Sequence, residues 1–558
     1  LSGEAGVGKT AVIKDLYDLV QSKVPLFIFK ATEFNNRSSI RALFSEFGDF
    51  SIYDLIAAYG DDEGKCIVID SAEKLADIED LEVFQEFLGL LLQHKWKIIF
   101  TTRRGYLDDL KYLLVNHYGV SFQPLDISSL THYELSSFAK EFGFALPNNN
   151  RMLDLIRNPF YLNEYLQNYD SLSKDVTYSE FKDILWDKQI AKSSYTKDNI
   201  HIRREECFLA LAQRRANVGS FFVKADGLES AILPKLVADE IIGFDKKVRG
   251  YFITHDIYEE WALERIIESA FHRQDSANNF YQELGESLPI RRAFRHWLSD
   301  KLIADKEAVK SLVESTIGDD NIPSHWRDEV LVSVLLSDHS KSFFELFEKE
   351  LLAQDNKLLI KITFLLRIAC KEIDDDLLKL IGIPSDQRMA LQTLFTKPKG
   401  SGWVYIIEFI NCHKEDLGLK GINSILGVLE DWNNKFKRGN TTRNASQVAL
   451  FYYEEVTKHG GFRYESDDLS KKIIKVILNG SFEIKDELSS IIDEIVSKKQ
   501  TSHRDKYYKL AQAMLSSAID SFDVARAIPE KIISLAGIFW VRNKEDADIY
   551  SYASGPMD

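Results

Sequence analysis

Cysteine is scarce in this sequence, with 4 residues in a chain of 558. Cys66, Cys207, Cys370 and Cys412 lie far apart along the chain. Their positions match no metal-ligand spacing, so the sequence offers no cysteine-based metal site. We interpret them as reduced thiols in buried cores, which is typical of the cytoplasm, where we expect the protein to reside.

Long apolar runs and an excess of positive charge are also missing. The nearest approach to an apolar run, FLGLLL at 87–92, is far shorter than the roughly 20 residues that a membrane-spanning helix needs. We therefore expect no membrane segment. Lys and Arg number 70 against 86 Asp and Glu, which gives a net charge of −16. This balance argues against a broad nucleic-acid-binding surface.

Proline becomes rare in the second half of the chain, where only 5 of the 11 prolines follow Pro289. They fall between segments whose apolar residues recur at helical spacing, as over 343–351 and 362–369. We expect 271–558 to be an all-α, solenoid-like stack of antiparallel helices of the repeat type. No fixed repeat period near 34 or 40 residues is present, so the predicted stack is irregular.

The most informative motif is GEAGVGKTA, which opens the chain and matches the phosphate-binding pattern G-x-x-x-x-G-K-[ST]. Glycines at positions 3, 6 and 8 let backbone N–H groups turn around a phosphate, Lys9 reaches the terminal phosphates and Thr10 binds Mg²⁺. The helix expected over 11–20 points its positive end at the same anion. The residues expected to contact the nucleotide are Gly3, Glu4, Ala5, Gly6, Val7, Gly8, Lys9, Thr10 and Ala11.

The sequence around this motif alternates strands with helices. Short apolar runs at 24–31, before Asp70 and before Arg103 read as strands covered on both faces, with helical patterns between them. This alternation predicts a doubly wound α/β domain, a P-loop NTPase fold, over 1–125. A P-loop normally leaves a buried strand, of which only Leu1 and Ser2 are present, so we expect the first strand to be completed upstream.

Three acidic or basic residues follow the predicted strands, at the sheet edge where such folds bind ligands. Asp70 is in the position of a Walker B carboxylate that holds Mg²⁺. Glu73 either positions the attacking water or is a solvated acid in the first turn of a helix. Arg103 either senses the γ-phosphate or is a surface arginine. We interpret the neighbouring Thr101 and Thr102 as sheet-edge residues rather than ligands.

Two further segments complete the predicted architecture. A small helical domain over 126–175 contains a capping box at Thr131 and Glu134. Its NPFYL segment has Pro159 at a helix start, where proline is either structural or lies against an adenine. Over 176–270, a short helix, a hairpin and a final helix that begins at His255 follow in the order of a winged-helix domain. A lone histidine there is more often a capping residue than a ligand.

Together, GEAGVGKTA, IVIDSAEKL, IIFTTRR, NPFYL and FITHDIYEEWAL resemble the STAND class of signal-transduction P-loop ATPases. Within that class the chain is similar to the bacterial antiviral proteins called Avs, and the motifs span about the first half of the chain. The resemblance implies that His255 contacts the β-phosphate and clamps an ADP-bound resting form, and that Pro159 lies against the adenine. In the family a second acid often follows the residue equivalent to Glu73, but here Lys74 does, which predicts slow hydrolysis.

The resemblance implies an ATP-dependent switch in antiviral defence. The helical region would sense a foreign, viral protein, and ATP binding would drive homo-oligomerisation that activates an effector encoded upstream. An AAA+-like motor or loader is an alternative, and it needs a second arginine sensor, for which Arg151 and Arg157 are candidates. A STAND transcriptional regulator and a scaffold with a structural P-loop are further alternatives. Nucleic acid is not expected as a partner of this segment.

Overall fold

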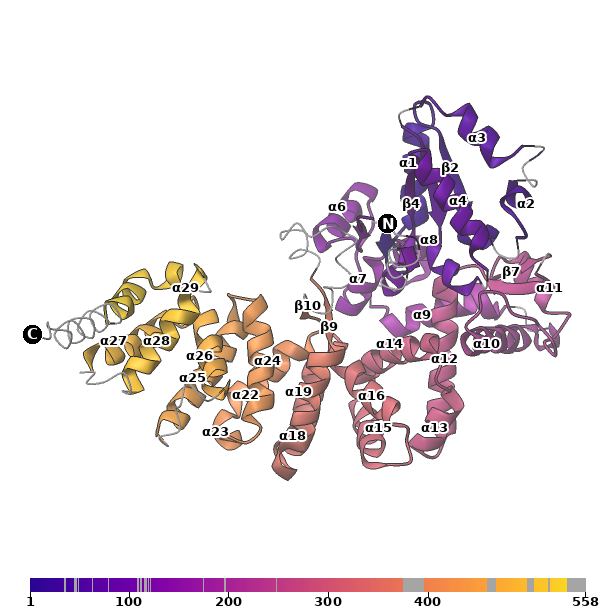
Figure 1. The fold of residues 1–558 in the computed structure, drawn as a ribbon. Helices are drawn as coiled ribbons and strands as arrows, with labels where there is room; N and C mark the ends of the chain where they lie inside the picture. Colours follow the sequence, from indigo (N-terminus) through magenta and orange to yellow (C-terminus); the bar gives the residue numbers. More distant parts are fainter. Residues whose placement is uncertain are drawn as a thin grey trace, which may run out of the picture. The chain divides into compact units, whose positions relative to one another are not determined.

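The computed structural model describes the chain outside residues 35–36, 45–47, 49, 63, 79, 108–109, 111–112, 115–117, 119, 121, 174, 195–196, 247, 375–395, 459–467, 499–505, 520–521 and 539–558. The described residues form two compact units. Unit 1 contains Leu1–Arg273 and Glu283–Ala293. Unit 2 contains Gln274–Gln282 and the described residues from Phe294 onward. Figure 1 labels most of the helices and some of the strands of both units.

Unit 1 begins with a parallel β-sheet. Its strands are β1 (Ser2–Gly3), β2 (Leu26–Lys30), β3 (Cys66–Asp70), β4 (Lys97–Phe100), β5 (Thr102–Arg103) and β6 (Asp126–Ile127). They hydrogen-bond in the orders β2-β3-β4 and β5-β1-β6. Thr101 links the two groups, because its N–H donates to Ile69 O at 3.0 Å while Thr102 N–H donates to Leu1 O at 2.9 Å. The run β4–β5 therefore separates β1 from β3.

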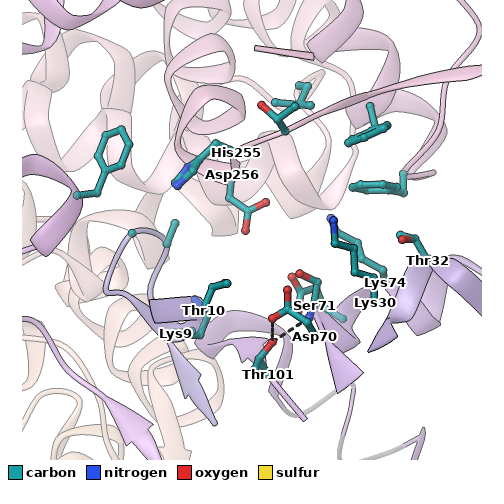
Figure 2. A pocket seen from close by; sticks show the side chains of 18 of the residues that line it. Lys9, Thr10, Lys30, Thr32, Asp70, Ser71, Lys74, Thr101, His255 and Asp256 are labelled. Atoms are coloured by element: carbon teal, nitrogen blue, oxygen red, sulfur yellow. Dashed lines mark hydrogen bonds between the residues drawn. The ribbon is translucent and has the colours of Figure 1, made fainter. Parts of the chain in front are cut away.

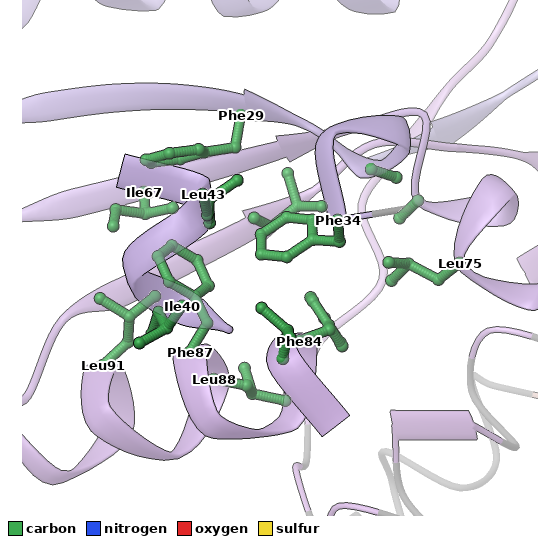
Figure 3. Packing of buried hydrophobic residues seen from close by; sticks show 14 of the residues in the cluster. Phe29, Phe34, Ile40, Leu43, Ile67, Leu75, Phe84, Phe87, Leu88 and Leu91 are labelled. Carbon is green, nitrogen blue, oxygen red and sulfur yellow. The ribbon is translucent and has the colours of Figure 1, made fainter. Parts of the chain in front are cut away.

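Helices cover both faces of this sheet, as the sequence predicts for an α/β domain. They are α1 (Lys9–Val20), α2 (Ile40–Phe44), α3 (Ile52–Ala58) and α4 (Glu82–Gln93). In β3, Cys66 and Val68 pack on the face that contains Ile13 of α1. Ile67 and Ile69 face the opposite cluster, which α2 and α4 close with aromatic side chains (Figure 3). Successive strand residues alternate between the faces, so a continuous apolar strand is buried on both.

The rest of unit 1 is mainly helical. Its elements are α6 (His132–Phe142), α7 (Asn150–Ile156), α8 (Pro159–Gln167), α9 (Tyr178–Trp186), α10 (Ile200–Val218), α11 (Leu233–Ala238), β7 (Ile242–Asp245), β8 (Gly250–Ile253) and α12 (Asp256–Arg273). The capping box is present, with Glu134 N–H donating to Thr131 Oγ1 at 3.1 Å and Thr131 N–H donating to Glu134 Oε2 at 2.7 Å. The antiparallel hairpin β7–β8 lies between α11 and α12 in the chain. A winged-helix identity for this order stays a prediction.

Unit 2 is largely helical. Two helices, α13 (Ala277–Leu284) and α14 (Leu288–Ala304), have residues in both units. The elements that follow them are α15 (Lys306–Gly318), α16 (Ser324–Leu336), α17 (Ser340–Leu346), α18 (Glu348–Leu352), α19 (Lys357–Ala369), β9 (Lys371–Ile373), β10 (Thr396–Pro398), α22 (Gly402–Cys412), α23 (Lys414–Leu417), α24 (Ile422–Lys435), α25 (Asn440–Lys458), α26 (Asp468–Asn479), α27 (Lys485–Ser497), α28 (Lys506–Ile519) and α29 (Phe522–Ala527). Most contacts join helices that are near in the chain, such as α24, α25 and α26. The solenoid-like arrangement stays a prediction.

The expectation that 271–558 is all α is wrong at one place. β9 and β10 form an antiparallel pair in which Lys371 lies opposite Pro398. Helix α22 holds the start of this pair in place, because Trp403 Nε1 in that helix donates a hydrogen bond to Cys370 O at 2.7 Å. Such short strands carry no alternating pattern that a sequence reading detects. Parts of the predicted region, 375–395, 459–467, 499–505 and 539–558, lie outside the described residues.

Within the described chain, no helix combines the length and the apolar character that crossing a membrane requires. The boundaries expected at 125, 175 and 270 do not separate compact units, since all of Leu1–Arg273 belongs to unit 1. They stay predictions. The structure thus gives a mixed α/β N-terminal region with a parallel sheet, and a largely helical remainder.

Candidate functional site

The loop between β1 and α1 has the backbone that its glycines permit. Gly6 and Gly8 adopt φ values of 78° and 93°, which favour glycine. A Cβ at Gly3 would come within 2.7 Å of Ile127 O, so the strand packs too closely there for a side chain. α1 begins at Lys9 with neither a side-chain cap nor an acidic residue in its first turn. Its free N–H groups and positive dipole end are therefore available to an anion.

Lys9 lies beside this helix end and points its ammonium at the loop. Lys9 Nζ donates hydrogen bonds to Gly3 O at 3.0 Å and to Glu4 O at 2.8 Å. Burial lowers the pKa of Lys9, while the carboxylate of Glu73 opposes that change. A partly desolvated cation held by two neutral carbonyls gains energy when a phosphate replaces them. The lysine is thus poised for an anionic ligand.

Asp70 ends β3, and Thr101 fixes its carboxylate. Thr101 Oγ1 donates to Asp70 Oδ1 at 2.6 Å and accepts from Ser71 N–H at 2.8 Å (Figure 2). Ser71 adopts a left-handed conformation with φ 58°, which costs energy for a residue with a side chain. The hydrogen bond to its N–H stabilises that turn. Thr101 therefore positions Asp70 and lines the cavity. Our interpretation of it as a sheet-edge residue rather than a ligand stays a prediction.

Glu73 and Arg103 form an ion-paired cluster next to Asp70. Arg103 Nε lies 3.6 Å from Glu73 Oε1, and Arg103 Nη2 pairs with Asp256 at the start of α12. The Glu73 side chain is 4% exposed, and among the described residues its Oε2 atom has no hydrogen-bond partner. A buried carboxylate oxygen with a vacant lone pair suits binding of a water or a proton. Arg103 is held between the sheet and α12.

The start of α8 contacts the phosphate-binding loop directly. Asn158 caps α8 by accepting from Phe160 N–H at 3.0 Å, and its Nδ2 donates to Ala5 O at 2.8 Å. Phe160 N–H also donates to Gly6 O at 3.1 Å. A Cβ on Gly6 would approach Asn158 Oδ1 to 2.8 Å, so only glycine permits this contact. Pro159 is consequently positioned over the loop.

His255 lies just before α12 and packs against α8. Its ring centroid is 4.9 Å from that of Phe160. Burial, followed by the charges of Arg103 and Lys9, lowers the pKa of His255 to about 4. His255 Nδ1 accepts from Ile257 N–H at 3.3 Å. The neutral ring therefore carries its proton on Nε2, which leaves one N–H donor for a ligand.

These residues surround one cavity of about 700 Å³ within unit 1. Of the predicted site residues, those that line it are Ala5, Gly6, Gly8, Lys9, Thr10, Ala11, Asp70, Glu73, Pro159 and His255. Gly3, Glu4, Val7 and Arg103 do not line it: Gly3 lies in β1, Val7 is buried and Arg103 is paired beside the cavity. Figure 2 shows His255 and Asp256 facing Lys9, Thr10 and Asp70 across the open space.

The cavity continues past Asp70 into a part that sequence reasoning missed, which we call the distal lobe. Its lining residues are Lys30, Thr32, Glu33, Lys74, Phe221, Phe222, Asp245 and Phe252. Lys30 ends β2 and Thr32 follows it, so the strand-end argument that located Asp70 also applies to them. The phenylalanines come from the segment after α10 and from β8. No local sequence signal connects them to the P-loop.

The residues present fit a Mg²⁺–nucleotide complex. The described residues contain no group of three or more His, Cys, Asp or Glu that would hold a metal without a ligand. Mg²⁺ commonly takes one or two protein oxygens together with phosphates and waters. Thr10 and Asp70 both line the cavity, and only Oδ1 of Asp70 is used by Thr101. Their oxygens would hold the ion that neutralises the phosphates.

No protein-family model matches the chain, and no curated protein matches it. Among solved structures, the Aeropyrum pernix ORC2 protein in ADPNP–ADP complexes is similar at a TM-score of 0.26 and 11% identity, over 47% of this chain and 85% of that chain. Drosophila ORC bound to DNA gives 0.22 and 13%, over 47% and 80%. The Aeropyrum pernix ORC1 protein in complex with DNA gives 0.22 and 15%, over 47% and 85%. At such TM-scores, the likeness decides neither fold nor function.

Proposed function

We propose that unit 1 binds ATP and ADP with Mg²⁺ and works as a nucleotide-dependent switch. One observation carries the proposal: Lys9, Thr10 and Asp70 line the same cavity as Pro159 and His255 from later helices. A nucleotide there touches the sheet and the helices that follow it. ATP and ADP make different contacts with the sheet and with these helices, so each nucleotide stabilises a different arrangement of the helices on the sheet.

Each side chain has a role in this proposal. Lys9 and the N–H groups of α1 bind the phosphates, Thr10 and Asp70 hold Mg²⁺, and Glu73 orients a water. Pro159 lies against the adenine, and His255 donates from Nε2 to the β-phosphate of ADP. Arg103, which is paired with Glu73 and Asp256, responds to the γ-phosphate. Hydrolysis is slow because Lys74 follows Glu73 where a second acid is common in the family that the motifs resemble.

The wider role that we propose is a STAND-type switch in antiviral defence. The helical remainder of the chain senses a viral protein, ATP then replaces ADP, and the protein forms a homo-oligomer that activates an upstream effector. This part of the proposal rests on the order of the five motifs. The net charge of −16 also favours a protein over nucleic acid as the trigger.

The AAA+-like motor stays an alternative, and the second arginine sensor that it predicts can be sought at the two candidate arginines. Arg157 Nε donates to Leu130 O at 2.6 Å, and the Arg151 guanidinium lies 4.6 Å from the centre of the Tyr178 ring. Neither arginine lines the cavity. A second arginine sensor, which a motor of this type requires, is thus not supplied by either candidate.

Identification of the nucleotide that co-purifies with the intact chain tests the proposal. The protein is denatured, and the released nucleotide is separated by ion-pair chromatography. We expect ADP in the wild type, none in Lys9→Ala, and reduced ADP in His255→Ala. Wild-type protein that neither retains ADP nor binds added ATP with Mg²⁺ would contradict the proposal.

Mass photometry of the full-length protein with ATP and Mg²⁺ tests the switch itself. We expect a discrete oligomer only when lysate from virus-infected cells is added. Constant mass with steady ATP turnover would contradict a switch and favour the motor class.

A further inference from the structure

Lys74 is a buried lysine whose ammonium has no anionic partner in the structure. The residue is 7% exposed, lies four positions after Asp70 and lines the distal lobe. Within the described part of the chain, Lys74 Nζ makes neither a hydrogen bond nor an ion pair. Figure 2 shows its side chain on the side of Asp70 away from Lys9. Buried lysines are usually paired, so this ammonium is suited to an anionic ligand that enters the cavity.

The Lys74 ammonium lies over an aromatic ring, and two arginines and two glutamates act on it. Lys74 Nζ lies 4.4 Å from the centre of the Phe221 ring. Glu259 forms an ion pair with Arg215, and Glu73 lies beside Arg103. Both of these carboxylates therefore already have an arginine. Burial, with Arg215 and Arg103, lowers the pKa of Lys74 to about 7, against the opposing effect of Glu73 and Glu259.

The cavity relates this lysine to the phosphate site. Lys9, Thr10, Asp70 and Lys74 all line the same space, with Asp70 between the two lysines (Figure 2). A nucleotide whose first phosphates lie on the P-loop extends its phosphate chain towards Asp70 and its Mg²⁺. The next negative group along that line enters the distal lobe. Only a triphosphate has such a group.

We propose that Lys74 binds the third phosphate of ATP and so makes the cavity distinguish ATP from ADP. The inference rests on the nucleotide-binding function proposed above. In the ADP state, Lys74 stays over the Phe221 ring and joins the sheet to the segment after α10. In the ATP state, the phosphate draws the ammonium away from the ring, because an ion pair in a desolvated site is stronger than a cation–π contact. The third phosphate thereby loosens the contact of Lys74 with Phe221, which joins the sheet of unit 1 to the segment after α10.

Two variants of the full chain test this proposal with changes of opposite sign. The affinities for ATP and ADP with Mg²⁺ are measured by isothermal titration calorimetry. Lys74→Met should weaken ATP binding about tenfold or more and leave ADP binding within about twofold, because it removes a charged contact to the third phosphate alone. Phe221→Leu removes the competing ring and should strengthen ATP binding by about threefold, again without a change for ADP.

Lys97→Met is the matched control. Lys97 is an exposed lysine in β4 that does not line the cavity, so its removal should change neither affinity. An unchanged ratio of the two affinities in Lys74→Met, with ATP and ADP still bound, overturns the role of Lys74 and leaves the proposed function standing. Loss of both nucleotides in Lys74→Met together with an unchanged ratio in Phe221→Leu also overturns it. Wild-type protein that binds neither nucleotide overturns both proposals.

Discussion

At the scale of single residues, Thr101 connects the two strands on which the site depends. Its side chain bonds Asp70, which is 31 positions earlier, and the N–H of Ser71 in its left-handed turn. The strand-end rule locates Asp70 and Glu73 from the sequence, because both follow an apolar run. The rule does not identify Thr101. The role of its hydroxyl depends on its hydrogen-bond partners, and the sequence does not show which residues these are.

Thr101→Val keeps the shape of the residue and removes both hydrogen bonds. We expect it to lower the free energy of unfolding by about 1–3 kcal/mol, since Asp70 Oδ1 and Ser71 N–H lose their partner, and to weaken Mg²⁺–ATP binding. Urea denaturation and calorimetry measure the two effects. Thr102→Val is the control, because Thr102 is equally buried at 1% exposure and its hydroxyl, within the described part of the chain, makes only a 3.4 Å contact to Arg103 O. Equal effects of the two changes would contradict the role of Thr101.

His255 provides a test by pH. Its pKa is about 4 in the folded chain, below the ordinary value of 6.5, with burial as the main cause. Between these values the unfolded chain binds more protons, so stability falls as the pH is lowered from about 6.5 to about 4. We expect His255→Gln to lose about 2 kcal/mol less over this window than the wild type, allowing for partial exposure of the ring. Urea midpoints across the window measure this, and parallel curves would refute the assignment.

At the scale of elements, the site depends on how α8 and α12 pack on the P-loop. Caps and prolines locate the start of α8 from the sequence, and the β7–β8 hairpin is equally readable. The contacts that bring these elements together cannot be read from the sequence, because Asn158 and Ala5, for example, are 153 positions apart. Helix positions follow from local patterns, whereas the choice of packing partner depends on the whole fold.

A buried hydrogen bond joins the two helices: Trp261 Nε1 in α12 donates to the hydroxyl of Tyr161 in α8 at 2.9 Å. Trp261→Phe should destabilise the protein by about 1–3 kcal/mol, because it leaves a buried hydroxyl without its partner. Tyr161→Phe should do the same. The double variant should lose less than the sum of the two, by about 1 kcal/mol, in urea denaturation. Strict additivity would show that the contact does not couple α8 to α12.

At the scale of the whole molecule, the fold class was largely predictable. Continuous apolar strands and helical periodicity gave the α/β region and the helical remainder. A local break was not predictable: apolar residues follow helical spacing over 343–351, and the structure ends α17 at Leu346 and begins α18 at Glu348. Phe347 between them has φ −105° and ψ 18°, outside helical geometry. Apolar spacing persists across such a break, so periodicity alone does not reveal it.

The division into two units gives a prediction for the intact chain. Every residue that lines the cavity belongs to unit 1. ADP with Mg²⁺ raises the free energy of unfolding of the unit that binds it, by about 2.7 kcal/mol at a concentration 100 times the Kd. Hydrogen exchange read by mass spectrometry should therefore show ADP-dependent protection in Leu1–Arg273 and little in α15–α29. Protection of equal size in both would contradict a site confined to unit 1.

The central claim is that the cavity binds nucleotide through Lys9, and calorimetric titration of Mg²⁺–ATP into the full chain tests it most directly. We predict one site per chain in the wild type, and a loss of affinity of at least about 100-fold in Lys9→Ala, because that variant removes a charge-assisted phosphate contact. Binding of equal strength by the two proteins, or no binding by the wild type, would contradict the account.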